Sequence, residues 1–252
     1  MSASAPTTFS AALSSVMRLS PGEPLVTFYD HSTFERVELS VITYANWVSK
    51  AAGLLADEHD LERGARIRLD LPTHWLGTVF LGAAWTVGLD VVLDDSVADS
   101  ELDAVVCGPD SLERWAEIAD DVPVLACSLL PLGVRFREPL PAGVHDVGVE
   151  VWGQPDAFTA WDAPTGADAA VTTAAGTLTQ AQTWETAASG SLLTDRGRLL
   201  TTLNPTSPSG VNVFTEPLVR AGSVVLVARP DADRLDAVAA QERTTSVLVN
   251  PS

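Results

Sequence analysis

Residues 66–93 read RIRLDLPTHWLGTVFLGAAWTVGLDVVL, and the fold class can be inferred from this segment. Its first six residues are typical of a strand, which Pro72 ends. From Thr73 on, apolar residues recur at helical spacing until Gly88, whose lack of a side chain suits the end of a helix. The chain then returns to a strand at residues 90–93. A strand, a helix and a second strand in this order indicate a parallel sheet with a helix packed on it.

The same alternation extends in both directions along the chain. Helices are predicted at 10–19, 43–57 (with Thr43 as the cap), 111–119, 180–193, 210–220 and 233–242. Strands are predicted at 25–29 and 35–40, forming a hairpin, and at 102–107, 122–126, 169–172, 198–201, 224–228 and 245–249. The helix that begins at Thr73 is expected to be strongly amphipathic. The predicted fold is α/β, a mostly parallel layered sheet with flanking helices.

One segment interrupts this pattern. Residues 131–166 are rich in proline and glycine and have no clear period, so they form an irregular connector, with edge strands around 147–151. We therefore divide the chain into a first α/β lobe at 1–130, this connector, and a second α/β lobe at 167–252. The whole is expected to form a single compact unit.

The charge of the chain limits its partners. Its 33 acidic and 15 basic residues give a formal net charge of −18, which disfavours binding to nucleic acids and to anionic membranes. No apolar run is long enough for a membrane helix, and no signal peptide is recognised, so we expect a cytoplasmic protein. The two cysteines, Cys107 and Cys127, are expected to be buried and unpaired. Lys50 is the only lysine, and it falls on the solvated side of its predicted helix.

Four stretches of the chain resemble, in order, the adenylate-forming enzymes, which include the acyl-CoA synthetases. They are LSVITYANW at 39–47; LERGARIRLDLP at 61–72 with WLGTVFLGAAWTVG at 75–88; DAAVTTAAGTLT at 168–179; and GRLLTTLNP at 197–205 with PLVRAGSVVLV at 217–227 and TTSVLVNPS at 244–252. The resemblance implies the fold of the N-terminal half of that superfamily. It also implies a short member without the C-terminal lid and its catalytic lysine.

The third stretch falls on the phosphate loop of this superfamily, whose pattern is T-S-G-T-T-G-x-P-K-G. In the best register, Thr172 to Gly176 fall on S-G-T-T-G, and Thr179 takes the place of the lysine. Two hydroxyl positions are alanine. The candidate cofactor-binding residues that remain are Thr172, Thr173, Gly176, Thr177 and Thr179, which could bind an anion weakly. The other interpretation is a structural turn from strand to helix with threonine caps.

No catalytic residue and no metal ligand is predicted elsewhere. The family places a histidine near the carboxylate substrate, but residues 203–210 contain none. His31, His59, His74 and His145 are interpreted as solvated or capping residues. Asp94 and Asp95 follow a strand and are interpreted as solvated loop residues. No cofactor is expected, and ATP, AMP or Mg²⁺ would bind only if the loop retained nucleotide affinity.

These features leave two main functional hypotheses. The first is a catalytically inactive homologue that binds a small carboxylate or acyl ligand, or contacts a partner protein. The second is half of a carboxylate-activating ligase, completed by a partner chain or a homodimer at a sheet edge that the strand at 245–249 exposes. An unrelated α/β hydrolase is a third possibility, but no G-x-S-x-G motif supports it.

Overall fold

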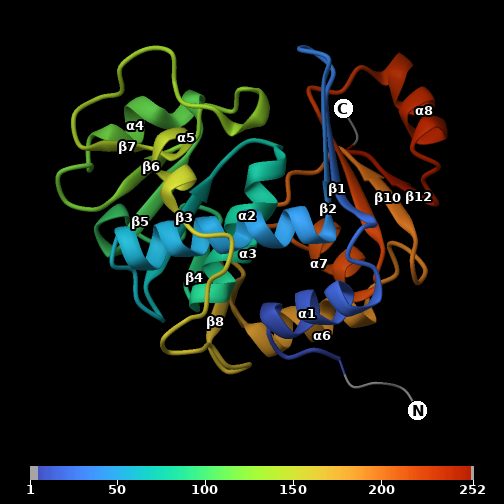
Figure 1. The fold of residues 1–252 in the computed structure, drawn as a ribbon, viewed down its shortest axis with the longest axis horizontal. Helices are drawn as coiled ribbons and strands as arrows, with labels where there is room; N and C mark the ends of the chain where they lie inside the picture. Colours follow the sequence, from blue (N-terminus) through green and yellow to red (C-terminus); the bar gives the residue numbers. More distant parts are fainter. Residues whose placement is uncertain (1–4, 251–252) are drawn as a thin grey trace.

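The computed structural model describes residues 5–250 and arranges their strands in two sheets (Figure 1). The five-stranded sheet has the order β12-β10-β11-β1-β2. Its strands are β1 (Pro24–Asp30), β2 (Glu35–Ser40), β10 (Arg198–Thr201), β11 (Ser223–Ala228) and β12 (Ser246–Leu248). The seven-stranded sheet has the order β7-β6-β5-β3-β4-β8-β9. Its strands are β3 (Arg66–Asp70), β4 (Asp90–Val92), β5 (Ala104–Cys107), β6 (Val124–Ala126), β7 (Val144–Asp146), β8 (Ala169–Thr173) and β9 (Gly176–Thr179).

Most neighbouring strands run parallel, which confirms the predicted fold class. Among the strand pairs within residues 5–250, only β1–β2 and β8–β9 are antiparallel. The predicted hairpin of residues 25–40 is the β1–β2 pair. Sheet membership does not follow the two sequence lobes, because β1 and β2 pair within the sheet of β10–β12. Conversely, β8 and β9 extend the sheet built by β3–β7.

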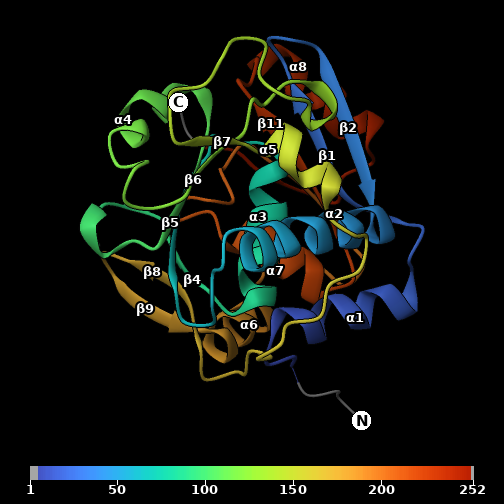
Figure 2. The same cartoon turned by 60° about the vertical axis from the view of Figure 1, so that its left-hand side comes forward.

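Helices fill the space between the sheets and cover their outer faces (Figures 1 and 2). The helices are α1 (Phe9–Leu19), α2 (Val41–Gly53), α3 (Trp75–Val87), α4 (Leu112–Ala116), α5 (Val147–Glu150), α6 (Gln180–Ser189), α7 (Asn212–Val219) and α8 (Ala232–Gln241). Short helical turns occur at η1 (Leu54–Glu58, a π-helix), η2 (Asp99–Glu101), η3 (Pro109–Ser111), η4 (Pro131–Gly133) and η5 (Val151–Gly153). Helix α3 contacts strands of both sheets, whereas α8 packs on the outer face of the five-stranded sheet and α4 on that of the other.

The central helix α3 differs from the predicted amphipathic helix because it is buried on all sides. Every residue from Trp75 to Val87 except Thr86 is buried. Its glycines allow this close packing: a Cβ atom at Gly82 would lie 2.5 Å from the Tyr44 hydroxyl. Gly88 ends the helix at φ +95°, as the sequence predicts. A helix enclosed by two sheets has no solvated face, so its apolar residues do not need to form one stripe.

Within the connector, the edge strands predicted around 147–151 are wrong. The edge strand β7 ends at Asp146, and Val147 to Gly153 are helical. The Asp146 carboxylate accepts a hydrogen bond from the Gly148 amide (2.9 Å) and so caps α5. This cap starts a helix at the residues where edge strands were expected.

Two details of α2 also correct the sequence analysis. Its N-cap is Ser40, whose hydroxyl accepts from the Thr43 amide. Lys50 is not solvated: only 18% of its side chain is exposed, and its ammonium group donates to the Gln154 carbonyl (2.5 Å) and pairs with Asp156 (3.0 Å). Lys50 therefore fixes α2 to the connector.

Cys107 and Cys127 are buried and free, as predicted. Within residues 5–250, none of the helices combines the length and the hydropathy that a membrane crossing requires.

Candidate functional site

The predicted phosphate loop is a β-hairpin at the edge of the seven-stranded sheet, beside α6 (Figure 2). β8 and β9 pair with Thr172 opposite Thr177 and Thr173 opposite Gly176, so only two residues form the turn. Gly176 has φ +119°, a conformation that side chains disfavour. The interpretation as a strand-to-helix turn with threonine caps is therefore only partly right: Thr179 caps α6, but the chain forms a hairpin before it reaches the helix. A strand of four residues, absent from the sequence-based prediction, precedes α6.

The hairpin brings four of the five candidate residues together, three threonines and Gly176. The hydroxyls of the three threonines already have hydrogen-bond partners within the protein. The Thr172 hydroxyl donates to the Asp90 carboxylate (2.8 and 2.9 Å) and lies 2.8 Å from the Thr177 hydroxyl. The Thr173 hydroxyl accepts from the Ala175 amide (3.2 Å).

The fifth candidate residue, Thr179, has a different role. It is the N-cap of α6, and its hydroxyl accepts from the Gln182 amide (3.3 Å). The Gln182 side chain accepts in return from the Thr179 amide (2.9 Å), which completes a capping box. Thr179 therefore stabilises a helix start at the position where the superfamily has its lysine.

A carboxylate occupies the turn of the hairpin. Asp94 accepts a hydrogen bond from the Ala174 amide (2.8 Å), which is a donor that a phosphate-binding loop would offer to its ligand. Hydrogen bonds from Ser96 and from the Ala174 amide lower the pKa of Asp94 below its usual value, so this group is ionised at neutral pH. Asp94 is therefore not a merely solvated loop residue. A bound phosphate would have to displace it and would meet its charge.

A second carboxylate, Asp90, also places negative charge beside the hairpin and would repel a phosphate. Asp90 is 6% exposed, and burial raises its pKa, while the Thr172 hydroxyl and Arg66 act in the opposite direction. The Asp90 carboxylate, on the neighbouring strand β4, thus accepts the hydrogen bond that the Thr172 hydroxyl could otherwise donate to a ligand. The sequence does not reveal this pairing, because Asp90 and Thr172 lie 82 positions apart and meet only through the β4–β8 pairing.

A cavity of about 250 Å³ lies between the hairpin, α6 and residues 208–212. Its lining is Val171, Thr173, Ala175, Gly176, Thr177, Leu178, Thr183, Thr186, Pro208, Ser209, Val211 and Asn212. None of these side chains is charged. Leu178, on β9, is 42% exposed. The cavity thus offers apolar surface, hydroxyls and one amide, but no cation.

The segment at 203–210, where a substrate-binding histidine would be expected from the resemblance, has a structural role next to this cavity. Asn204 and Thr206 both donate side-chain hydrogen bonds to the Leu71 carbonyl, at 2.7 and 3.0 Å. These two hydrogen bonds fix Leu71, which follows β3, to the loop that precedes α7. His74 and His31 are both buried and accept backbone hydrogen bonds, from Leu76 and Asp231 respectively. His74 is therefore a capping residue, as predicted, whereas His31 is neither solvated nor a helix cap, because it accepts from Asp231, the N-cap of α8. Neither histidine lines the cavity.

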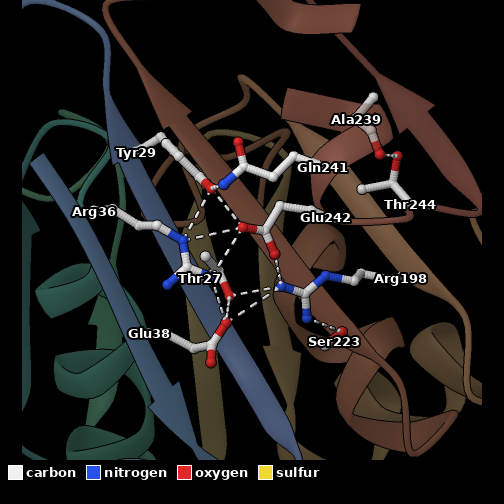
Figure 3. Close-up of polar contacts among 10 residues, drawn as sticks. All are labelled: Thr27, Tyr29, Arg36, Glu38, Arg198, Ser223, Ala239, Gln241, Glu242 and Thr244. Atoms are coloured by element: carbon white, nitrogen blue, oxygen red, sulfur yellow. Dashed lines mark hydrogen bonds and ion pairs between the residues drawn. The ribbon is translucent and has the colours of Figure 1, made fainter. Parts of the chain in front are cut away.

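A second polar cluster, on the outer face of the five-stranded sheet, is internally paired (Figure 3). Glu242, which follows α8, accepts hydrogen bonds from Tyr29, Arg36 and Arg198. Glu38 adds a salt bridge to Arg36 (2.7 Å). Arg198 and Ser223 begin their strands, whereas Tyr29 lies near the end of β1, so the cluster lies across the outer face of the sheet. It is not confined to the carboxyl ends of the strands, where α/β proteins usually build binding sites. We interpret it as a structural network that fixes α8 to the sheet.

A third cluster joins residues that the sequence analysis treated as unrelated. His59, His145 and Glu150 place possible metal-ligand atoms within 4.8 Å of one another. Sequence spacing gave no signal for this group, since His59 and Glu150 are 91 positions apart.

Comparison with known proteins identifies relatives of the whole chain. No protein-family model matches it. A "TIGR03089 family protein" of Mycobacterium tuberculosis (strain ATCC 25618 / H37Rv) is 34% identical over 249 residues, which cover 96% of this chain and 99% of that protein.

Solved structures share the fold. An acyl-CoA synthetase of Brucella canis matches with a TM-score of 0.78 and 16% identity, over 95% of this chain and 47% of its own. The inhibitor-bound N-terminal domain of FACL13 from Mycobacterium tuberculosis matches with a TM-score of 0.70 and 15% identity, over 94% and 61%. The chain thus spans about half the length of the synthetase structures whose fold it shares.

Proposed function

Because the chain belongs to the TIGR03089 family and has the fold of the N-terminal half of acyl-CoA synthetases, we propose that it does not form acyl adenylates. It binds instead a short acyl ligand in the cavity beside the β8–β9 hairpin. The observation that carries this proposal is that two hydrogen-bond donors of the hairpin already have partners within the protein. Its Ala174 amide and its Thr172 hydroxyl are hydrogen-bonded to the protein's own carboxylates, Asp94 and Asp90.

Charge supports the first part of the proposal. Catalysis of adenylate formation requires donors and cations directed at the phosphates, where negative charge grows in the transition state. In this hairpin the two donors bond to the acidic side chains Asp90 and Asp94 instead of facing a phosphate. Thr179 lies at the position of the phosphate-loop lysine, so the cation is also missing from this loop. The net charge of −18 adds a repulsive field for an anion such as ATP.

The lining of the cavity supports the second part. Its volume of about 250 Å³ lies below the ~300–1,000 Å³ of pockets that hold drug-sized ligands, so the ligand must be short. A free carboxylate would find no cation there, whereas an uncharged acyl group could pack on Leu178 and Val211 and bond to the hydroxyls. Of the two ligand classes considered, the neutral acyl group fits better.

A titration tests this function. The protein is titrated by calorimetry with ATP, AMP, octanoate and methyl octanoate, alongside the variants Ser209→Trp and Ser100→Trp. Ser209 lines the cavity, whereas Ser100 is an exposed residue of η2 and serves as the matched control.

We expect the ester to bind, Ser209→Trp to weaken it at least tenfold, and Ser100→Trp to leave it unchanged. The two nucleotides should give no saturable heat. Saturable ATP binding would overturn the first part of the proposal, and ester binding that is insensitive to Ser209→Trp would overturn the second.

The alternative is half of a ligase completed by a second chain. In its favour, β12 forms one edge of the five-stranded sheet, and Val247 on it is 57% exposed. Against it, the substitution of Thr179 for the lysine lies within this half, so a partner that supplied other motifs would not restore the loop. Sedimentation equilibrium tests the homodimeric form of this alternative, which requires a stable dimer that Val247→Lys dissociates. Pyrophosphate exchange by the chain mixed with a separate C-terminal half of an acyl-CoA synthetase tests the form that needs a partner chain.

A further inference from the structure

Two histidines and a glutamate form a compact cluster at the junction of η1 with the connector. One ring nitrogen of His59, one of His145 and a carboxylate oxygen of Glu150 all lie within 4.8 Å of one another. The Glu150 carboxylate lies 3.0 Å from His59 Nε2 and 2.9 Å from His145 Nδ1. The two imidazole rings meet edge to face, with their centroids 4.4 Å apart.

The local fold positions these side chains from three separate elements. His59 follows the π-helix η1, a wider turn that often marks functional positions in proteins. His145 lies in the edge strand β7, and Glu150 ends α5. The Lys50 contacts to Gln154 and Asp156 hold α2 and its η1 extension against the same part of the connector.

The chemistry of the three groups is that of a transition-metal site. Two imidazoles and one carboxylate form the ligand set of several zinc enzymes, with an open fourth position for water. Tetrahedral bonds of ~2.0–2.2 Å place neighbouring ligand atoms about 3.4 Å apart. The two histidines contact different oxygens of Glu150, at 3.0 and 2.9 Å, and the three ligand atoms lie within 4.8 Å of one another, so the groups would have to move only slightly closer to bind one ion.

Exposure of the side chains fits the same arrangement. The His59 side chain is 6% exposed, whereas those of Glu150 and His145 are 27% and 39% exposed. The site is thus closed on the His59 side and open to solvent on the other, which leaves access for an ion and for a water ligand. The negative charge of the protein also raises the local concentration of cations.

We propose that His59, His145 and Glu150 bind one Zn²⁺ ion, with water as the fourth ligand. The ion replaces the hydrogen bonds that now join the carboxylate to the two rings and links η1 to the connector. Imidazole ligands favour Zn²⁺ over Mg²⁺ and Ca²⁺, which prefer oxygen. The proposal is independent of acyl binding, because none of the three residues lines the cavity beside the hairpin.

Zinc binding to the full chain tests the proposal. The protein is stripped with a chelator and titrated with Zn²⁺ by calorimetry, and its melting temperature is recorded with and without the ion. The variants are His59→Gln, Glu150→Gln and, as the matched control, Glu138→Gln. Glu138 is an exposed carboxylate of the same connector, so its removal changes the net charge equally.

We expect one Zn²⁺ per chain, a rise in melting temperature with zinc, and at least a tenfold loss of affinity in both cluster variants. Glu138→Gln should bind like the unaltered protein. Cobalt should give the strong visible absorption of a four-coordinate site and lose it in Glu150→Gln. Two results would overturn the site: no saturable binding near one equivalent, or equal affinity in Glu150→Gln and Glu138→Gln, which would indicate diffuse binding to an acidic surface.

Discussion

The substitution Glu242→Gln tests whether the network of Figure 3 fixes α8 to the five-stranded sheet. Gln keeps the shape of the side chain but removes the charge that Arg36 and Arg198 share. The Glu242 side chain is only 6% exposed and that of Arg198 15%, so their charge-assisted pair is largely shielded from water, whereas Arg36 is 40% exposed.

The size of the effect follows from these exposures. A hydrogen bond to a charged group contributes about 1.5–3 kcal/mol when it is shielded, and an exposed pair at most about 1 kcal/mol. Most of the loss therefore comes from Arg198. We expect the free energy of unfolding to fall by about 2–3 kcal/mol, which for a chain of this length lowers the melting temperature by about 4–12 °C.

The assay is urea denaturation followed by tryptophan fluorescence, with Glu38→Gln as the control. Glu38 contacts the same two arginines but is 36% exposed, so its substitution should cost less than about 1 kcal/mol. A loss below about 0.5 kcal/mol in Glu242→Gln, or equal losses in the two variants, would refute the structural role of the network.

The difference between Glu242→Gln and the unaltered protein should also depend on pH. Burial opposes ionisation of Glu242, but hydrogen bonds from Tyr29, Arg36 and Arg198 outweigh it, so its pKa lies below the ordinary 4.5. A lowered pKa in the folded state stabilises the protein above pH 4.5, and this contribution is lost as the pH falls through the folded-state pKa. The difference in unfolding free energy should thus be constant at neutral pH and shrink below about pH 4.5.

Two further substitutions test the hairpin, each by the free energy of unfolding in urea. Gly176→Ala places a side chain at φ +119° and should destabilise the protein by about 1–3 kcal/mol, whereas Ala175→Gly in the same turn should cost much less; equal effects would contradict the strained turn. Thr179→Ala removes the capping box of α6 and should cost about 1 kcal/mol, while Thr186→Ala, at an exposed position of the same helix, should stay within about 0.5 kcal/mol. A Thr179→Ala protein as stable as the unaltered one would exclude the capping role.

The sequence was sufficient for the elements whose pattern is local. The stretch at 66–93 predicts β3, α3 and β4 to within a few residues, because Pro72 and Gly88 mark the ends and apolar residues fill the rest. The parallel arrangement follows from the same alternation. A local pattern does not show how many other elements pack against a helix. The burial of α3 on all sides was therefore missed.

For the candidate site, the sequence indicates which residues lie close together but not what they contact. Thr172, Thr173, Gly176 and Thr177 do meet in one hairpin, but its partners Asp90 and Asp94 arrive from β4 and the loop after it. The contact of His59 with Glu150 likewise depends on the fold that brings η1 to α5. Strand β9 was missed because its four residues, three of them glycine or threonine, carry no apolar alternation.

ATP–pyrophosphate exchange tests the central claim most directly, namely that the hairpin with its two carboxylates does not support adenylate formation. The chain is incubated with ATP, Mg²⁺, labelled pyrophosphate and a panel of aliphatic and aromatic carboxylic acids, with an active acyl-CoA synthetase as the positive control. We expect no exchange above the blank for any acid. Exchange that depends on a carboxylic acid and is lost in Thr172→Val would contradict this claim.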